Sequence, residues 1–141
     1  MSPRRRVVVT GGGGLCALGR GWPALRDGLR SGRSGVAIIP AWDGIEGLRT
    51  RLGAPVRDAD LVHAIPRKPL RGMGRVALLA ALAAQDALAD AGLEGHAIVS
   101  DGTLGLAFGS TSGSPPSLVA YSRAFGVDRS TKGASPSDYL K

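Results

Sequence analysis

Four consecutive glycines, Gly11–Gly14, follow an apolar run at Arg4–Thr10. Many phosphate-binding sites begin with a strand that leads into such a turn, because backbone N–H groups and a following helix N-terminus can hold an anion. The Walker pattern requires a lysine followed by serine or threonine after the last glycine, whereas Leu15-Cys16 stands there. The residues therefore exclude a Walker-type site.

A dinucleotide site is the second possible use of these glycines. The pattern G-x-G-x-x-G/A fits only as Gly12, Gly14 and Ala17. Asp43 would have to hold the ribose, and Leu18–Gly21 delays the helix whose N-terminus should face the pyrophosphate. We favour a packing turn, in which the glycines allow close approach to a neighbouring element. A nucleotide-binding (Rossmann-like) oxidoreductase domain remains the alternative.

Cys16 could act as a nucleophile if a base and an oxyanion hole lay nearby. The two histidines, His63 and His96, stand in no recognisable catalytic setting. These three residues also lack the close spacing of a metal site, and a single cysteine forms no internal disulfide. We interpret Cys16 as a small buried side chain and the histidines as surface residues, and we expect no cofactor.

The positive charge is concentrated in the first half of the chain. The net charge is +7, and residues 1–75 hold 14 Lys/Arg against 5 Asp/Glu. Such a surface attracts an anionic partner. The chain lacks the interleaved aromatics and motifs of nucleic-acid binding, and it has no apolar run long enough to cross a bilayer. We therefore expect neither nucleic acid nor membrane as a partner, and a cytoplasmic protein.

The apolar pattern predicts a single α/β domain. Arg4–Thr10 and Thr103–Gly109 are expected to be buried strands, since their apolar residues do not alternate with polar ones. An edge strand is expected at Arg49–Val56 and a helical turn at Asp58–Ala64. Helices are expected at Trp22–Leu29, Gly74–Ala91 and Leu118–Phe125. The alanine-rich helix at 74–91 should be closely packed, with Gly92 as its C-cap.

Four separated stretches resemble, in order, the N-terminal part of the β-ketoacyl-acyl-carrier-protein synthases, the type II condensing enzymes. They are "RRRVVVTGGGGLCALGRGWPALRDGLRSGRSGV", "PRKPLRGMGRVALLAALAAQDALADAGL", "LGLAFGSTSGS" and "KGASPSDYL". The stretch Ile39–Asp43 further resembles the branch associated with aryl-polyene pathways. The resemblance covers essentially the whole chain.

The resemblance implies an α/β, thiolase-like fold, of which residues 1–141 would form the N-terminal half only, an incomplete layered α/β/α structure. It implies decarboxylative Claisen condensation by a homodimer that receives its substrates from an acyl carrier protein. The family's catalytic cysteine and both catalytic histidines would lie beyond residue 141, so the chain alone should be inactive. Cys16, His63 and His96 do not align with those residues. A non-catalytic partner subunit is the alternative within this family.

The resemblance also assigns site residues, none of them catalytic. The basic positions that dock the acidic carrier protein would be Arg67, Lys68, Arg71 and Lys132. Ser112 falls where the family places a side chain that gates the acyl pocket. Tyr139 and its neighbour Asp138 fall where side chains cross the dimer interface into the partner's pocket. Gly72 replaces one further basic residue of the docking surface.

Overall fold

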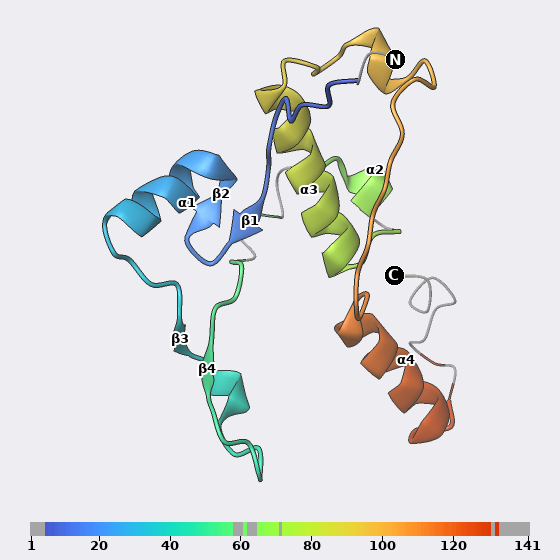
Figure 1. Cartoon of the computed structure of the whole chain (residues 1–141). Helices are drawn as coiled ribbons and strands as arrows, with labels where there is room; N and C mark the ends of the chain where they lie inside the picture. Colours follow the sequence, from blue (N-terminus) through green and yellow to red (C-terminus); the bar gives the residue numbers. More distant parts are fainter. Residues whose placement is uncertain (1–4, 58–60, 62–64, 71, 131, 133–141) are drawn as a thin grey trace.

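The computed structural model describes residues 5–57, 61, 65–70, 72–130 and 132 (Figure 1), with Arg67 described in its backbone only. The elements are β1 (Leu15–Cys16), β2 (Gly19–Arg20), α1 (Gly21–Arg30), β3 (Ala37–Ile38), η1 (Pro40–Trp42), β4 (Leu52–Gly53), α2 (Arg67–Leu70), α3 (Arg75–Asp90), η3 (Ala97–Val99) and α4 (Pro115–Gly126). Their order confirms the predicted α/β character. The helical turn expected at Asp58–Ala64 lies outside the described residues, apart from Leu61.

Helix α3 is the central element, and the sequence predicted its bounds to within one residue. Alanine and leucine dominate it, and both have high helix propensity. Gly92 follows the helix with a φ of +69°, and the N–H of Leu93 donates to the carbonyl of Leu88 at 2.8 Å. This is a Schellman-type ending, in which glycine adopts the left-handed conformation without a Cβ clash.

The N-terminus of α3 receives its cap from a residue distant in sequence. The N–H of Val76 donates to Oγ of Ser114 at 3.4 Å, and Ser114 is buried directly before α4. Helix α4 starts three residues earlier than predicted, at Pro115, because prolines are tolerated in the first turn of a helix. Ser114 thus joins the starts of α3 and α4.

The strands that form are short and antiparallel. β1 pairs with β2 as a tight hairpin, with Leu15 opposite Arg20. β3 pairs with β4, with Ile38 opposite Leu52, so the edge strand expected within Arg49–Val56 is confirmed over two residues. These pairs make two separate two-stranded sheets in the described part of the chain.

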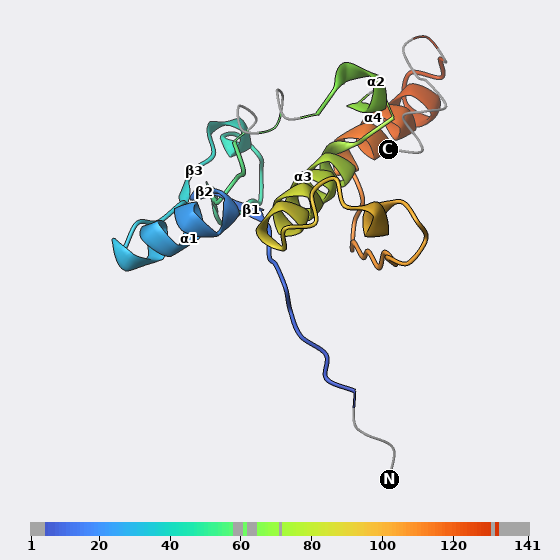
Figure 2. The same ribbon diagram turned by 90° about the horizontal axis from the view of Figure 1, so that it is seen from above.

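The two buried strands predicted at Arg4–Thr10 and Thr103–Gly109 are wrong for the described residues. Residues 5–10 run as an extended segment with no strand partner, and their valines are exposed. Residues 103–109 are likewise unpaired, and Leu106 and Phe108 are exposed. A strand is buried only when other strands pair with its backbone and other layers cover its faces. No described segment does this here, and Figure 2 shows residues 5–10 running away from α3 as an isolated arm.

The hydrophobic core is small and lies along α3. Leu61, Ile65 and Leu82 are buried together, and Leu15, Val56, Leu70, Met73, Leu78, Leu79 and Ala81 pack around them. The hairpin β1–β2 and α2 therefore meet on the same helix. In the described ranges no helix combines the length and apolarity needed to span a bilayer.

Candidate functional site

The glycine segment, Gly11–Gly14, lies directly on the backbone of α3. A Cβ added to Gly11 would stand 2.6 Å from the backbone nitrogen of Ala91, and one added to Gly13 would stand 2.7 Å from that of Ala87. Real Cβ atoms do not approach so closely, so these two positions accept glycine alone. The predicted packing turn is confirmed, and the element that it approaches is α3.

Two carboxylates on α3 hold this segment and the hairpin that follows it. Asp90 Oδ2 accepts the N–H of Gly12 at 2.9 Å. Both oxygens of Asp86 accept from Arg20 Nε, at 3.0 and 2.9 Å, and Oδ1 also accepts from Nη2. The hydrogen bonds to Asp86 raise the pKa of the Arg20 guanidinium, against an opposing effect of partial burial. The chain is thereby fixed to α3 on both sides of β1.

A cavity of about 490 Å³ opens between the glycine segment and α1. It is lined by Gly12, Gly13, Gly14, Leu15, Cys16, Gly21, Trp22, Leu25 and Asp90. Cys16 is half-buried rather than buried as predicted, and its thiol donates to the Gly19 carbonyl at 3.7 Å. Cys16 lines this cavity, so part of its side chain faces open space, and this explains why it is only half-buried.

Among the described residues, this cavity lacks the partners that nucleophilic catalysis or phosphate binding requires. The histidine that the structure describes, His96, is exposed, and its Nδ1 accepts the N–H of Ile98 at 3.2 Å. His63 lies outside the described residues. Asp90 places a negative charge beside the backbone amides that would have to face a phosphate. Asp43, which would have to hold the ribose, instead forms an ion pair with Arg51, with Oδ1 and Nη1 2.9 Å apart. The dinucleotide alternative therefore receives no support from the geometry.

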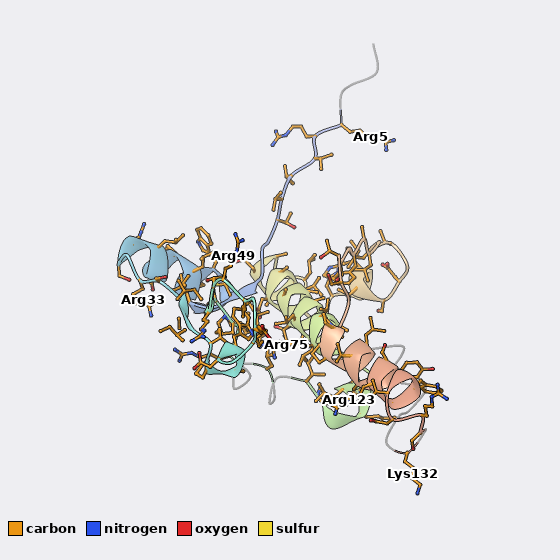
Figure 3. All side chains as sticks on the ribbon, turned by 90° about the horizontal axis from the view of Figure 1, so that it is seen from below. Arg5, Arg33, Arg49, Arg75, Arg123 and Lys132 are labelled. Carbon is orange, nitrogen blue, oxygen red and sulfur yellow. The ribbon has the colours of Figure 1, made fainter. Side chains whose placement is uncertain are left out.

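The predicted docking residues lie on two separate parts of the fold. Lys68 is exposed on α2, where the backbone of Arg67 also lies, and Arg71 is outside the described residues. Lys132 is exposed beyond α4, and Figure 3 shows its side chain pointing away from the ribbon. Figure 1 shows α2 beside α3 and the far end of α4 well removed from it. Among the described residues, Arg67 and Lys68 are sequence neighbours on α2, and Lys132 lies apart from them.

Ser112 lies in an exposed turn between two serines with structural roles. Ser110 Oγ accepts the N–H of Gly113 at 3.1 Å, and Ser114 is the buried cap of α3. Ser112 is absent from the lining of the cavity beside Cys16. Its assignment to an acyl pocket stays a prediction, and Tyr139 and Asp138 lie outside the described residues.

Sequence reasoning missed the residues that organise this part of the fold. Arg20, Asp86, Asp90 and Ser114 received no role from their types or spacing. One signal was available, since Asp86 and Asp90 stand four residues apart in an alanine-rich helix and so share one face. That face also carries Ala83 and Ala87, on which the glycines pack.

The comparisons with known proteins agree with this architecture. The family model described as the β-ketoacyl synthase N-terminal domain matches residues 4–137. Nodulation protein E of Rhizobium meliloti is 40% identical over 108 residues, which are 74% of this chain and 26% of the relative. The 3-oxoacyl-(acyl-carrier-protein) synthase 1 of Escherichia coli is 32% identical over 132 residues, which are 94% of this chain and 32% of the relative.

Two solved structures share the arrangement of the chain. A β-ketoacyl synthase from Burkholderia phymatum superposes with a TM-score of 0.84 and 40% identity, covering 97% of this chain and 33% of that chain. The ishigamide ketosynthase/chain length factor superposes with a TM-score of 0.69 and 28% identity, covering 98% and 34%. The chain therefore spans about a third or less of the length of each of these relatives.

Proposed function

The chain belongs to the β-ketoacyl synthase family, whose N-terminal domain it matches over residues 4–137, and from this premise we propose that it forms the N-terminal part of a condensing acyltransferase. The observation that carries the proposal is the superposition on a β-ketoacyl synthase, with a TM-score of 0.84 at 40% identity over 97% of the chain. The thiolase-like fold expected from the sequence is thereby shown for this part of the protein.

The reaction is a decarboxylative Claisen condensation. An acyl group moves from its carrier thioester to a cysteine thiolate, malonyl-carrier protein loses CO₂, and the resulting carbanion attacks the enzyme-bound acyl carbon. A new carbon–carbon bond forms, the cysteine leaves as thiolate, and the product is a 3-oxoacyl-carrier protein. Cys16 does not serve as the nucleophile, since its thiol donates to the Gly19 carbonyl and no described histidine lies in the cavity beside it. The reacting groups come from the part of the enzyme that this chain does not span.

The role of this chain is then structural support and recognition of the carrier protein. Acyl carrier proteins are acidic, and exposed cations speed the encounter with an acidic partner. Lys68 on α2 and Lys132 after α4 are both exposed, which supports a docking role for these two lysines. The same role is proposed for Arg67 and Arg71 on their positions in the sequence. The proposed enzyme is a cytoplasmic homodimer of fatty acid or polyketide synthesis, and the aryl-polyene branch is the specific pathway that we propose within it.

A chimeric enzyme tests this function. Residues 1–141 would replace the matched third of the Burkholderia synthase, and the product would be assayed by mass spectrometry with acyl- and malonyl-carrier proteins. We expect 3-oxoacyl-carrier protein and released CO₂. The control chimera has its nucleophilic cysteine, contributed by the Burkholderia part, replaced by alanine. A folded dimeric chimera that forms no product would refute the proposal.

The same assay separates the condensing enzyme from a non-catalytic partner subunit. A non-catalytic subunit would assemble with an active synthase in a pull-down and leave the chimera without condensing activity. A chimera that condenses as its own homodimer counts against that alternative, because residues 1–141 then support a catalytic dimer.

A further inference from the structure

A second cavity, of about 580 Å³, lies where three segments of the chain meet. Its walls are the turn of the β1–β2 hairpin (residues 17–19), the loop after α1 (residues 33–37), and Pro55 with Arg57 after β4. It shares no lining residue with the cavity beside Cys16. Sites for small molecules typically have volumes of about 300–1,000 Å³, so this cavity is large enough for a metabolite.

The loop after α1 is held in place by its backbone. Gly32 has a φ of +65°, and the N–H of Arg33 donates to the carbonyl of Gly28 at 2.9 Å, as in a Schellman-type helix ending. Gly35 then packs on the hairpin, because a Cβ added there would overlap the side chain of Ala17. These two contacts fix the loop against the hairpin and form one edge of the cavity.

The side chain of Arg33 is oriented by a hydrogen bond at one of its three nitrogens. Its Nε donates to Oγ of Ser31 at 3.3 Å, and that hydroxyl donates to the carbonyl of Asp27 at 2.7 Å. Neither Nη of Arg33 has a hydrogen bond or an ion pair within the residues that the structure describes. The edge of the guanidinium between these two nitrogens is therefore available to hold an anion by two parallel hydrogen bonds.

Arg57 lines the same cavity from the segment after β4. Its neighbour Val56 packs against the hydrophobic core along α3, and the carbonyl of Val56 accepts from Arg75 Nη2 at 2.6 Å. Arg57 itself is exposed and forms no ion pair with any described residue. Asp58 and Asp60, which follow it in the sequence, lie outside the described residues. The anchored Val56 thus holds a second guanidinium beside the cavity.

The polar groups of this cavity favour an anionic ligand. Both of its charged side chains are cations, and no acidic residue belongs to its described lining. The backbone N–H groups of Ser34 and Gly35 make no hydrogen bond in the described part of the chain, so they are further donors. A phosphate dianion carries more acceptor oxygens and more charge than a carboxylate, and so matches two guanidinium groups better. Leu18, Val36 and Pro55 add apolar surface for an organic group.

We propose that this cavity binds a small organic phosphate, with the phosphate group held by Arg33 and Arg57 and the organic part against the apolar residues of the wall. The site is distinct from the proposed carrier-protein docking residues. Figure 3 shows Arg33 on the opposite side of the molecule from Lys132. The proposal does not depend on condensing activity, because binding in this cavity requires none of the reacting groups.

Isothermal titration calorimetry with phenyl phosphate tests the proposal, both on this chain and on the chimeric synthase that contains it. Inorganic phosphate and phenol, which each represent one half of the probe, would be titrated in parallel. We expect phenyl phosphate to bind at one site, at least about tenfold more tightly than either half, and more weakly as salt increases. Absence of binding, or equal affinity for phenol or inorganic phosphate, would overturn the proposal.

Matched variants locate the site. Arg33→Gln and Arg57→Gln should each lower the affinity for phenyl phosphate at least about tenfold, because each removes charge-assisted hydrogen bonds to the phosphate. Arg33→Lys should also lower it, since lysine keeps the charge but lacks the planar fork. Arg30→Gln and Arg49→Gln are the controls, because both are exposed arginines outside the cavity. An equal loss in all four glutamine variants would indicate unspecific attraction and contradict the site.

The same variants distinguish a small ligand from a protein partner. They would be titrated with an acidic acyl carrier protein under the conditions used for phenyl phosphate. We expect Arg33→Gln and Arg57→Gln to affect the phosphate probe and to leave carrier-protein binding within about twofold. If they weakened binding of the carrier protein and left phenyl phosphate unaffected, the cavity would be part of a protein-docking surface and the proposal would be wrong.

Discussion

Arg20 and Asp86 form a forked ion pair across 66 positions of the sequence, with Arg20 Nε 3.0 and 2.9 Å from the two carboxylate oxygens of Asp86. Their side chains are 31 and 22% exposed, so water screens the pair only in part. The pair connects β2 to α3 and fixes the hairpin beside the glycine segment. Arg26 and Asp27 form a second pair, but on the exposed surface of α1 and between sequence neighbours.

Asp86→Asn should therefore lower the free energy of unfolding by about 1–2 kcal/mol, because it weakens a charge-assisted, partly buried hydrogen bond. Asp27→Asn is the matched control and should change stability by less than about 0.5 kcal/mol. Urea denaturation followed by circular dichroism measures both variants. Equal midpoints for the two would show that the Arg20–Asp86 pair is not stabilising.

Gly13→Ala should destabilise the chain by about 1–3 kcal/mol, since its Cβ would stand 2.7 Å from the backbone nitrogen of Ala87 in α3. Gly12→Ala is the control, because its Cβ meets no atom within 4 Å. That substitution should be neutral or slightly stabilising through the unfolded state. Thermal unfolding of both variants measures the difference, and a well-tolerated Gly13→Ala would contradict the packing turn.

Cys16→Ser should leave condensing activity unchanged within about twofold in the chimeric enzyme. Its thiol donates to Gly19 in a cavity without a described histidine, so it lacks the base that activates a cysteine. The nucleophile variant of the Burkholderia part should abolish product under the same assay. If Cys16→Ser abolished activity as the nucleophile variant does, with folding intact, Cys16 would have a catalytic role.

Lys68→Glu combined with Arg71→Glu should weaken binding of the carrier protein in the chimera, because it reverses charge at the proposed docking surface. The effect should be greatest at low salt and shrink as screening increases. Arg30→Glu combined with Arg33→Glu, at the end of α1 and just after it, provides an exposed control of the same charge change. Surface plasmon resonance over a range of salt concentrations measures it. Unchanged affinity at low salt would remove Lys68 and Arg71 from the docking surface.

Ser112→Phe should slow elongation of long acyl chains while sparing short ones, if the residue gates the acyl pocket. Ser112→Ala is the control and should accept both chain lengths, because it adds no bulk. Turnover with short and long acyl-carrier proteins measures the selectivity. An equal loss for both lengths would indicate a general disturbance of the turn that precedes the buried Ser114.

The sequence alone predicted the three longer helices, α1, α3 and α4, but not the short α2. Alanine and leucine in α3 and the glycine after it act through hydrogen bonds three or four residues apart, so their effects are visible locally. The start of α4 at Pro115 was missed by three residues. The order of four family-like stretches also indicated the β-ketoacyl synthase family, which the match over residues 4–137 confirms.

Tertiary structure decided what the glycines approach and whether the predicted strands are covered. Gly11 and Gly13 pack on α3 through residues more than 60 positions away, and no local pattern specifies that neighbour. Val7–Val9 have the composition of a buried strand but stand exposed, because strand pairing and burial depend on distant segments. A helix satisfies its own backbone, whereas a strand and a close backbone contact need a partner that only the assembled fold provides.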